Sequence, residues 1–257
     1  MSAIADGLVI TKRNLLQIPR VPELLVFSTI QPIMFVLLFA YVFGSAIPLP
    51  GGGSYRAFLM AGIFTQTVAF STAVTAVGLA EDLQRGLIDR FRSLPMARSA
   101  VLVGRTNADL VRNVFIVIIM SLCGLLVGWR IEGGFWRALV GFALLLLFGY
   151  SMSWIGAIIG LSVRSVETAN TAGFIWLFPL TFLSHAFVPT GGLPGPLKWI
   201  ADHNPVSFVA SACRDLFGNP NPFAIEGALW KAVAINLLIL VIAVPIAVRK
   251  FRAASAK

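Results

Sequence analysis

Charged residues are scarce in this 257-residue sequence. Asp, Glu, Lys and Arg together make up 12% of it, whereas an ordinary soluble domain carries about 25%. Hydrophobic residues make up 58%, so a water-soluble fold of this size would lack the polar side chains needed to cover its surface. The composition argues against a soluble protein and predicts one membrane domain over residues 1–257.

Motifs for catalysis and cofactor binding are also missing. The sequence has no G-x-x-x-x-G-K-[ST] stretch, so we expect no ATP bound through a P-loop of this chain. It has no H-E-x-x-H, and neither His185 nor His203 has a neighbour at metal-ligand spacing. The two cysteines, Cys123 and Cys213, are too few for a disulfide scaffold. We predict no catalytic residue, metal or cofactor on this chain.

Six apolar segments are long enough, or nearly so, to cross a membrane as helices, which takes about 20 residues. None of them contains Asp, Glu, Lys or Arg. The third and sixth are short, so we expect their helices to extend into the flanking polar residues. The pattern predicts an all-α membrane protein with six spans, at Val26–Phe43, Phe58–Leu79, Val114–Trp129, Ala138–Val163, Thr168–Val188 and Ala232–Val248.

The net charge is +9. On a soluble protein this value would suggest nucleic acid, but basic loops on the cytoplasmic side of a membrane explain it better. With the N-terminus inside, 14 of the 20 Lys and Arg residues fall in cytoplasmic segments. We therefore expect no nucleic-acid partner, and a multi-pass protein of the cell (plasma or inner) membrane with both termini in the cytoplasm.

The N-terminal stretch before the first span has helical periodicity with two unlike faces. Pro19 and Pro22 then end the helical pattern. The pattern predicts an amphipathic helix in the cytoplasmic interface, serving as a membrane-surface anchor and leaving a partner contact open. The faces are Ile4, Leu8, Thr11, Leu15 and Ile18 on one side, and Asp6, Arg13 and Gln17 on the other.

The long cytoplasmic loop, Glu81–Arg105, has helical periodicity in its first half. Apolar residues share one face (Leu83, Leu87, Phe91, Leu94), and oppositely charged residues pair on the other (Glu81 with Arg85, Asp89 with Arg92). Pro95 breaks this helix, and a second short helix is expected over Met96–Val103. A solvated connector would not need an apolar stripe, so the pattern favours an element that docks on a partner.

The predicted outside segment, Pro189–Lys231, is interrupted by prolines and too apolar for a free loop. We expect two short helices in it, Pro196–His203 and Pro205–Phe217, the second with Asn204 as N-cap and Gly218 just past its end. Each is too short to cross a membrane. The segment predicts an extracellular re-entrant or interface-lying hairpin, acting as an interfacial lid or as a cap over an exit path.

Two other kinds of membrane protein fit the topology. A secondary transporter or channel would work without an ATPase, but ion-coupled transporters usually carry an acidic side chain inside a span, and the predicted spans have none. A membrane-embedded enzyme or assembly factor would need a convergent set of titratable groups, which the sequence also lacks. Both alternatives are disfavoured on these grounds.

The whole pattern resembles the permease subunit of type-2 ABC exporters, and within them the daunorubicin-resistance (DrrB-like) group. One matching stretch is E-x₄-G-x₂-[DE]-R-x-R-x-L-P, made by Glu81, Gly86, Asp89, Arg90, Arg92, Leu94 and Pro95. The other runs from Phe182 to Leu216, with Phe187-Val188-Pro189, Leu193-Pro194 and Asn204-Pro205-Val206. The resemblance covers nearly the whole chain.

The resemblance implies a transport subunit that works beside two copies of a separate ABC ATPase, which bind ATP and magnesium. It also implies a second permease copy or a homologous permease, and an amphipathic drug-like or lipid substrate. The coupling helix would lie after span two, with the contact residues Glu81, Arg85, Gly86, Leu87, Asp89, Arg90, Phe91, Arg92, Leu94, Pro95 and Arg98.

The resemblance further places spans two and five along the substrate path. Aromatic residues with one glutamine fall on nearby helical positions of these spans, and such a lining suits an amphipathic ligand. Ordinary packing or lipid-facing Phe side chains explain the same pattern equally well. The path candidates are Phe64, Gln66, Phe70, Phe174, Phe178 and Phe182.

Overall fold

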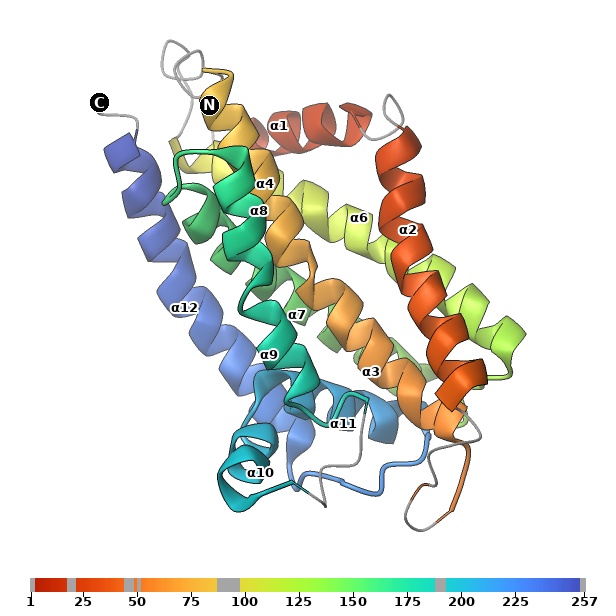
Figure 1. Cartoon of the computed structure of the whole chain (residues 1–257). Coiled ribbons are helices and arrows are strands. Elements are labelled where there is room, and N and C mark those ends of the chain that lie inside the picture. Colours follow the sequence, from red (N-terminus) through yellow and green to blue (C-terminus); the bar gives the residue numbers. More distant parts are fainter. Residues whose placement is uncertain are drawn as a thin grey trace.

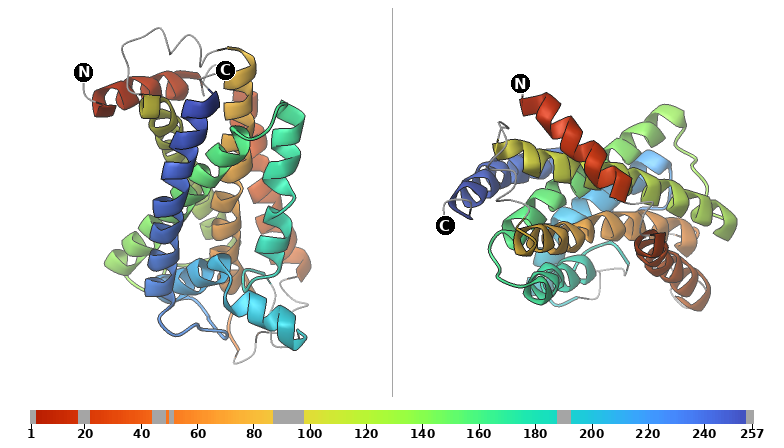
Figure 2. Two further views of the ribbon diagram at one scale, coloured as in Figure 1. Left: turned by 90° about the vertical axis from the view of Figure 1, so that its left-hand side faces the viewer. Right: turned by 90° about the horizontal axis from the view of Figure 1, so that it is seen from above.

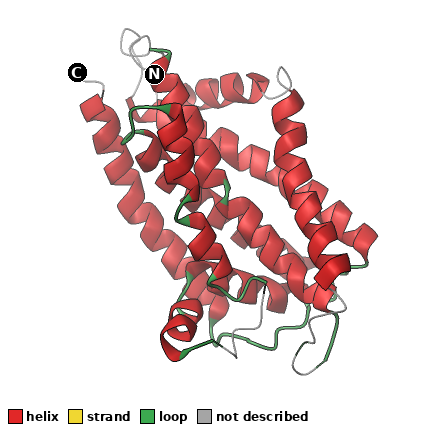
Figure 3. Cartoon of the chain, viewed as in Figure 1, coloured by secondary structure: helices red, strands yellow, loops and turns green. Residues whose placement is uncertain are grey.

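Helices form nearly all of the structure, a computed structural model that describes residues 3–17, 22–43, 49, 52–86, 98–187 and 193–254. These residues form helices, turns and loops without a strand (Figure 3). The helices are α1 (Ala3–Gln17), α2 (Pro22–Leu37) with the π-helical continuation η2 (Leu38–Phe43), α3 (Tyr55–Ala69), α4 (Ser71–Gln84), α6 (Arg98–Val127), α7 (Phe135–Gly160), α8 (Val166–Phe174), α9 (Leu177–Phe182), α10 (Gly195–Asp202), α11 (Pro205–Phe217) and α12 (Ala228–Ala254).

Four helical segments are long and apolar enough to cross a membrane among the described residues: Tyr55–Gln84, Ala100–Val127, Phe135–Gly160 and Ala228–Ala253. A shorter apolar helix covers Thr29–Val42. The third and sixth predicted spans extend into polar sequence, as expected, because α6 begins at Arg98 and α12 at Ala228. The short helix expected over Met96–Val103 is therefore wrong: from Arg98 onward these residues are the first turns of α6.

The fifth predicted span is not one helix. Its first part is α8, its second part is α9, and the interruption falls at Ile175 and Trp176. Pro179 explains the position, because a proline ring clashes with the carbonyl four residues earlier, which is that of Ile175. The remainder of the predicted span, from Leu183 to Phe187, forms turns.

The centre of the bundle is the contact between α4 and α7. A Cβ atom at Gly156 would lie 2.3 Å from the Thr72 carbonyl oxygen, and one at Gly160 would lie 2.6 Å from that of Ala76. Only glycine allows the two backbones to approach so closely, which is the usual way apolar helices pack within a membrane. Thr72 adds a hydrogen bond from its hydroxyl to the Met152 carbonyl.

The two ends of the bundle carry different elements (Figures 1 and 2). Helix α1 lies across one end, near the end of α4 and the last turns of α12, and it packs on α6. Helices α10 and α11 lie at the opposite end. Both ends of the described chain are therefore on the same side of the bundle.

Helix α1 packs on α6 at a close crossing. Among the α1 residues whose side chains are described, Gly7, Ile10, Thr11 and Asn14 are buried; of the predicted apolar stripe, Thr11 is buried and Leu15 is half-buried, while the side chains of Ile4, Leu8 and Ile18 lie outside the described part. A Cβ atom at Gly104 of α6 would lie 2.6 Å from Cβ of Ile10. Two glycines, Gly7 and Gly104, therefore let the two helices approach closely.

The predicted pair of short helices is present as α10 and α11. Helix α11 spans the predicted residues, with the Asn204 side chain accepting from the Val206 N–H and Gly218 in the left-handed conformation at its end. Its side chains are mostly buried against α3, α7 and α12. Helix α10 instead exposes Leu197, Trp199 and Ile200.

Candidate functional site

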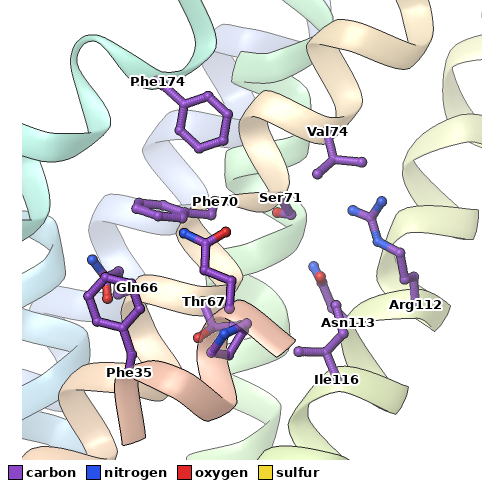
Figure 4. A pocket seen from close by; sticks show the side chains of 12 residues that line it. Phe35, Gln66, Thr67, Phe70, Ser71, Val74, Arg112, Asn113, Ile116 and Phe174 are labelled. Atoms are coloured by element: carbon purple, nitrogen blue, oxygen red, sulfur yellow. The ribbon is translucent and has the colours of Figure 1, made fainter. Parts of the chain in front are cut away.

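A cavity of about 100 Å³ lies between α2, the α3–α4 junction, α6 and α8. Figure 4 shows Arg112, Asn113 and Ile116 entering from α6, and Phe70 and Phe174 on the other side. Its walls are apolar at Pro32, Phe35, Phe70, Val74, Ile116 and Phe174, and polar at Gln31, Gln66, Thr67, Ser71, Arg112 and Asn113.

Aromatic rings continue from the cavity along α8 and α9. The Phe70 ring centroid lies 5.6 Å from that of Phe174 and 5.8 Å from that of Phe178. Phe178 stacks on Phe182 at 6.1 Å. The series then returns along η2 and α2 through Phe187, Phe39 and Phe35, with centroid separations of 5.4, 5.2 and 5.9 Å. We call these seven residues the aromatic track.

The aromatic track is partly open. Phe178 and Phe182 are 46% and 49% exposed, and their neighbour Ile175 is 70% exposed. Exposed aromatic and aliphatic side chains next to a cavity form a surface on which the apolar part of a ligand, lipid or another protein subunit can lie. The track therefore joins the cavity to the surface of the bundle.

Two buried amides in the cavity have no acceptor. The Nε2 atom of Gln66 and the Nδ2 atom of Asn113 lack a hydrogen-bond partner within the described part of the chain, although these residues are only 3% and 1% exposed. A buried donor without an acceptor costs about 1–3 kcal/mol. Such donors are uncommon in packed interiors, and these two belong to residues that line a cavity, where a molecule that enters can accept from them.

A buried charge network extends from the cavity to the end of the bundle that carries α1. Arg112 lies 3.5 Å from Oδ1 of Asp109, and Oδ2 of the same carboxylate accepts a 2.7 Å hydrogen bond from the Thr75 hydroxyl. Arg105 lies 3.8 Å from both Asp109 and Asp82. Asp82, in the last turn of α4, is also 3.8 Å from Arg13 of α1. The network thus joins α1, α4 and α6.

Gly78 makes room for the middle of this network. A Cβ atom at this position would lie 1.7 Å from a terminal nitrogen of Arg105. The guanidinium therefore lies directly on the α4 backbone, one turn before Asp82. This contact holds Arg105 between the two carboxylates, so the geometry of the network is built into the packing of α4 on α6.

The predicted path residues separate into two groups. Gln66, Phe70 and Phe174 line the cavity, and Phe178 and Phe182 continue it in the aromatic track. Phe64 lies apart from them. It is fully buried and packs edge-on against Trp129, Phe142 and Phe217 in the core.

The predicted coupling residues are described only in part. Glu81 and Arg85 form an exposed i,i+4 ion pair at 3.5 Å where α4 ends. The helix stops there because Gly86 has a φ of +65°, a conformation that glycine adopts at no steric cost. The predicted face that joins Leu83 to Leu87 in one uninterrupted helix is therefore wrong. Residues 87–97 lie outside the described part of the chain, and so does the side chain of Arg98. The predicted coupling residues in this range are Leu87, Asp89, Arg90, Phe91, Arg92, Leu94 and Pro95.

Sequence reasoning missed Arg112 and Asn113, which lie just before the predicted start of span three. It also treated the spans as free of charge, yet Asp109 is 4% exposed and lies within a helix long enough to cross a membrane. The i,i+4 and i,i+3 spacing of Arg105, Asp109 and Arg112 was the available signal. The absence of an acidic side chain is therefore not an argument against an ion-coupled transporter.

Comparison with known proteins decides the family. The family model for ABC-2 type transporters matches residues 7–217. The chain belongs to this family. It is 34% identical over 215 residues to the daunorubicin resistance ABC transporter permease protein DrrB1 of Streptomyces coeruleorubidus, covering 84% of this chain and 76% of that protein.

Two further relatives of this ABC-2 permease are more distant. The probable doxorubicin resistance ABC transporter permease protein DrrC of Mycobacterium tuberculosis is 23% identical over 98% of this chain and 90% of its own length. The putative transport permease ycf38 of Cyanophora paradoxa is 24% identical over 84% and 75%. The chain is thus a DrrB-like type-2 ABC permease, a multi-pass membrane protein whose relatives are transport subunits rather than enzymes.

Proposed function

We propose that this permease is the membrane-spanning subunit of an ATP-driven exporter that moves an amphipathic drug-like or lipid compound out of the cell. Two copies of a separate ATPase subunit would hydrolyse ATP with magnesium. A second permease copy, identical or homologous, would complete the path. Family membership supports an ATPase partner in general, and the resistance functions named for the relatives support an amphipathic substrate.

The observation that carries this proposal is the continuity between the charge network and the cavity. Asp82 lies at the start of the predicted coupling segment, Glu81–Arg105, which would dock on the ATPase. From Asp82 the ion pairs lead through Arg105 and Asp109 to Arg112 at the cavity. A displacement of the segment by the ATPase would therefore reach the cavity through directly contacting charged groups.

We propose six spans, with α2–η2 as the first and the broken pair α8–α9 as the fifth. Both ends of the described chain lie on one side of the bundle, which supports an even number of crossings. The excess of Lys and Arg supports a cytoplasmic location for that side in the cell membrane. Helices α10 and α11 would then be the external hairpin, and the exposed Trp199 of α10 suits a membrane interface.

Thiol labelling in intact cells tests this orientation. Single-cysteine variants at Ser93 and Ser255, with Cys123 and Cys213 replaced, should react with an impermeant reagent only after the membrane is opened. A cysteine at Thr190 should react in intact cells. Labelling of the Ser93 position from outside would contradict the topology.

Reversing the charge of Arg92 tests the coupling. Arg92→Glu should insert normally but should reduce both co-purification with the ATPase and ATP-driven transport into inverted vesicles. The reason is that removing one partner of a charge pair buried at an interface costs about 2–5 kcal/mol of binding free energy. Phe91→Ala should act in the same direction. Lys250→Glu makes the same charge change on the same side and should have no effect. Wild-type assembly and transport in both Arg92→Glu and Phe91→Ala would mean that coupling occurs elsewhere.

The same vesicles test the alternative of a secondary transporter, which the buried Asp109 keeps open. Vesicles that contain the permease without an ATPase should not accumulate substrate when a proton or sodium gradient is imposed. Accumulation driven by such a gradient would replace ATP coupling with ion coupling.

A further inference from the structure

The polar side of the cavity presents hydrogen-bond donors in excess of acceptors. The Nε2 atom of Gln66 and the Nδ2 atom of Asn113 have no partner among the described residues, and neither has the Nε atom of Arg112. All three residues line the same cavity. Arg112 and Asn113 are consecutive on α6, while Gln66 approaches from α3 (Figure 4). Arg112 and Asn113 therefore present donors on one side of the cavity, and Gln66 presents one on the side of Phe35 (Figure 4).

Arg112 is the charged residue that lines the cavity in the described part of the chain. Its carboxylate partner, Asp109, is also bound by Arg105 and by the Thr75 hydroxyl. Among the described residues, no carboxylate lines the cavity itself. An anion placed there would meet Arg112 directly, whereas a cation would meet the same arginine and would find Asp109 already shared by two arginines.

The size of the cavity limits what enters it. A volume of about 100 Å³ is well below the roughly 300–1,000 Å³ of sites that enclose a drug-sized molecule. The cavity therefore holds only one end of an amphipathic compound. The apolar remainder has a continuous surface available, because Phe70 and Phe174 lead directly to the exposed rings of Phe178 and Phe182.

We infer that the cavity binds the negatively charged head group, a phosphate or a carboxylate, of an amphipathic compound whose apolar part lies on the aromatic track. Arg112 supplies charge-assisted donation, Asn113 adds a neighbouring donor from α6, and Gln66 offers a further donor on the aromatic side of the cavity. The inference rests on the proposed function, since it names the class of substrate that the exporter would select. It excludes amphiphilic amines as preferred ligands of this site.

Binding to the full-length permease in neutral-detergent micelles, without an ATPase, tests the inference by titration calorimetry. The probes share a twelve-carbon chain and differ in the head group: dodecyl phosphate, dodecanoate, dodecanol and dodecylammonium. The two anions should bind at least about tenfold more tightly than the alcohol or the amine, as expected for one charge-assisted interaction. Equal or tighter binding of dodecylammonium would overturn the inference.

Variants separate ligand binding from folding. Arg112→Gln should abolish the preference for anions, and Arg112→Lys should restore part of it. Asn113→Leu removes a donor that has no partner, so it should leave thermal melting unchanged or raised while it weakens dodecyl phosphate binding several-fold. Arg137→Gln, an exposed arginine outside the cavity, is the matched control. Unchanged anion binding in both Arg112→Gln and Asn113→Leu would overturn the assignment.

Inorganic phosphate distinguishes a head-group site from a site for the free anion. Because the aromatic track contributes to binding, millimolar phosphate should not displace dodecyl phosphate from the wild-type protein. Full displacement would overturn the amphipathic part of the inference. The binding measurements need no ATP, so anion binding without ATP-driven transport would count against the proposed function alone. Transport of amines but not of anions would count against this inference alone.

Discussion

At the end of the bundle that carries α1, ion pairs with separations of 3.5–3.8 Å join α1, α4 and α6. At the opposite end, hydrogen bonds of 2.7–2.9 Å hold α11 and the loop after α6 in place. In the first region each carboxylate is shared by two arginines. In the second, Nε and Nη2 of Arg214 each have a carbonyl acceptor of their own.

The two ends differ in how many pairings of their polar side chains the packing allows. Shared ion pairs that are longer than hydrogen bonds can exchange partners at little cost. Arg214, by contrast, is fully buried, donates to the carbonyls of Phe58 and Ala186, and lies 3.6 Å from the centre of the Phe58 ring. These bonds are satisfied by one geometry only. We expect motion during transport at the charged end, with α11 as the fixed end.

The largest effect should follow from removing Arg214. Arg214→Met removes the side-chain donors to two buried carbonyls, those of Phe58 and Ala186, which should destabilise the protein by about 2–5 kcal/mol. The measurements are thermal melting in neutral detergent and the reaction of Cys213, which is fully buried in the wild type, with a thiol reagent. Arg137→Met should change neither. A wild-type melting temperature in Arg214→Met would mean that α11 is held by apolar packing alone.

The next largest effect should come from Asp109→Asn. The amide can still accept a hydrogen bond from Thr75, but Arg105 and Arg112 lose the carboxylate between them. Breaking a buried charge pair costs about 2–5 kcal/mol, so ATP-driven transport should fall at least about tenfold relative to ATP turnover. Thr75→Val removes one hydroxyl donor and leaves Arg105, Asp109 and Arg112 in place, so its effect should be smaller. An unchanged ratio of transport to ATP turnover in Asp109→Asn would mean that the charge network does not take part in coupling.

The same contrast explains which parts of the structure the sequence predicted. The bounds of α11 were predicted because they depend on adjacent residues: the Asn204 cap, Pro205 at the first position and Gly218 at the end. The interruption of the fifth predicted span also has a local cause, Pro179, although the span was predicted as one segment. The charge network was missed because Asp82 and Arg105 are separated by 23 positions in the chain and meet only when α4 packs on α6.

The candidate cavity was predicted in part for the same reason. Phe70, Phe174 and Phe178 were predicted to form an aromatic surface from two spans, and the structure brings these rings together. Phe64 was assigned to the same surface but packs in the core. Which face of a helix is buried depends on its neighbours, and periodicity within one helix does not give that information.

A smaller effect should follow from Asp82→Asn. Asp82 is 18% exposed, and its two ion pairs are 3.8 Å long, so each contributes roughly 0.2–1 kcal/mol. Transport per ATP hydrolysed should fall about two- to fivefold, with little change in melting temperature. Asp82→Glu keeps the charge and should retain most of the activity. An effect as large as that of Asp109→Asn would show that the exposed part of the network is not the weaker part.

The smallest effect on stability should come from Glu81→Gln. Glu81 and Arg85 are exposed, with side-chain exposures of 41% and 69%, and such i,i+4 pairs stabilise a helix by only about 0.3–0.5 kcal/mol. Melting should therefore be unchanged. If Glu81 instead contacts the ATPase, as the family resemblance implies, co-purification should weaken about two- to fivefold. The control is Glu226→Gln, which removes an acidic charge near α12 at the opposite end of the bundle and should alter neither property. A fall in melting temperature without loss of the ATPase would make Glu81 a structural residue and move the docking contact to residues 87–97.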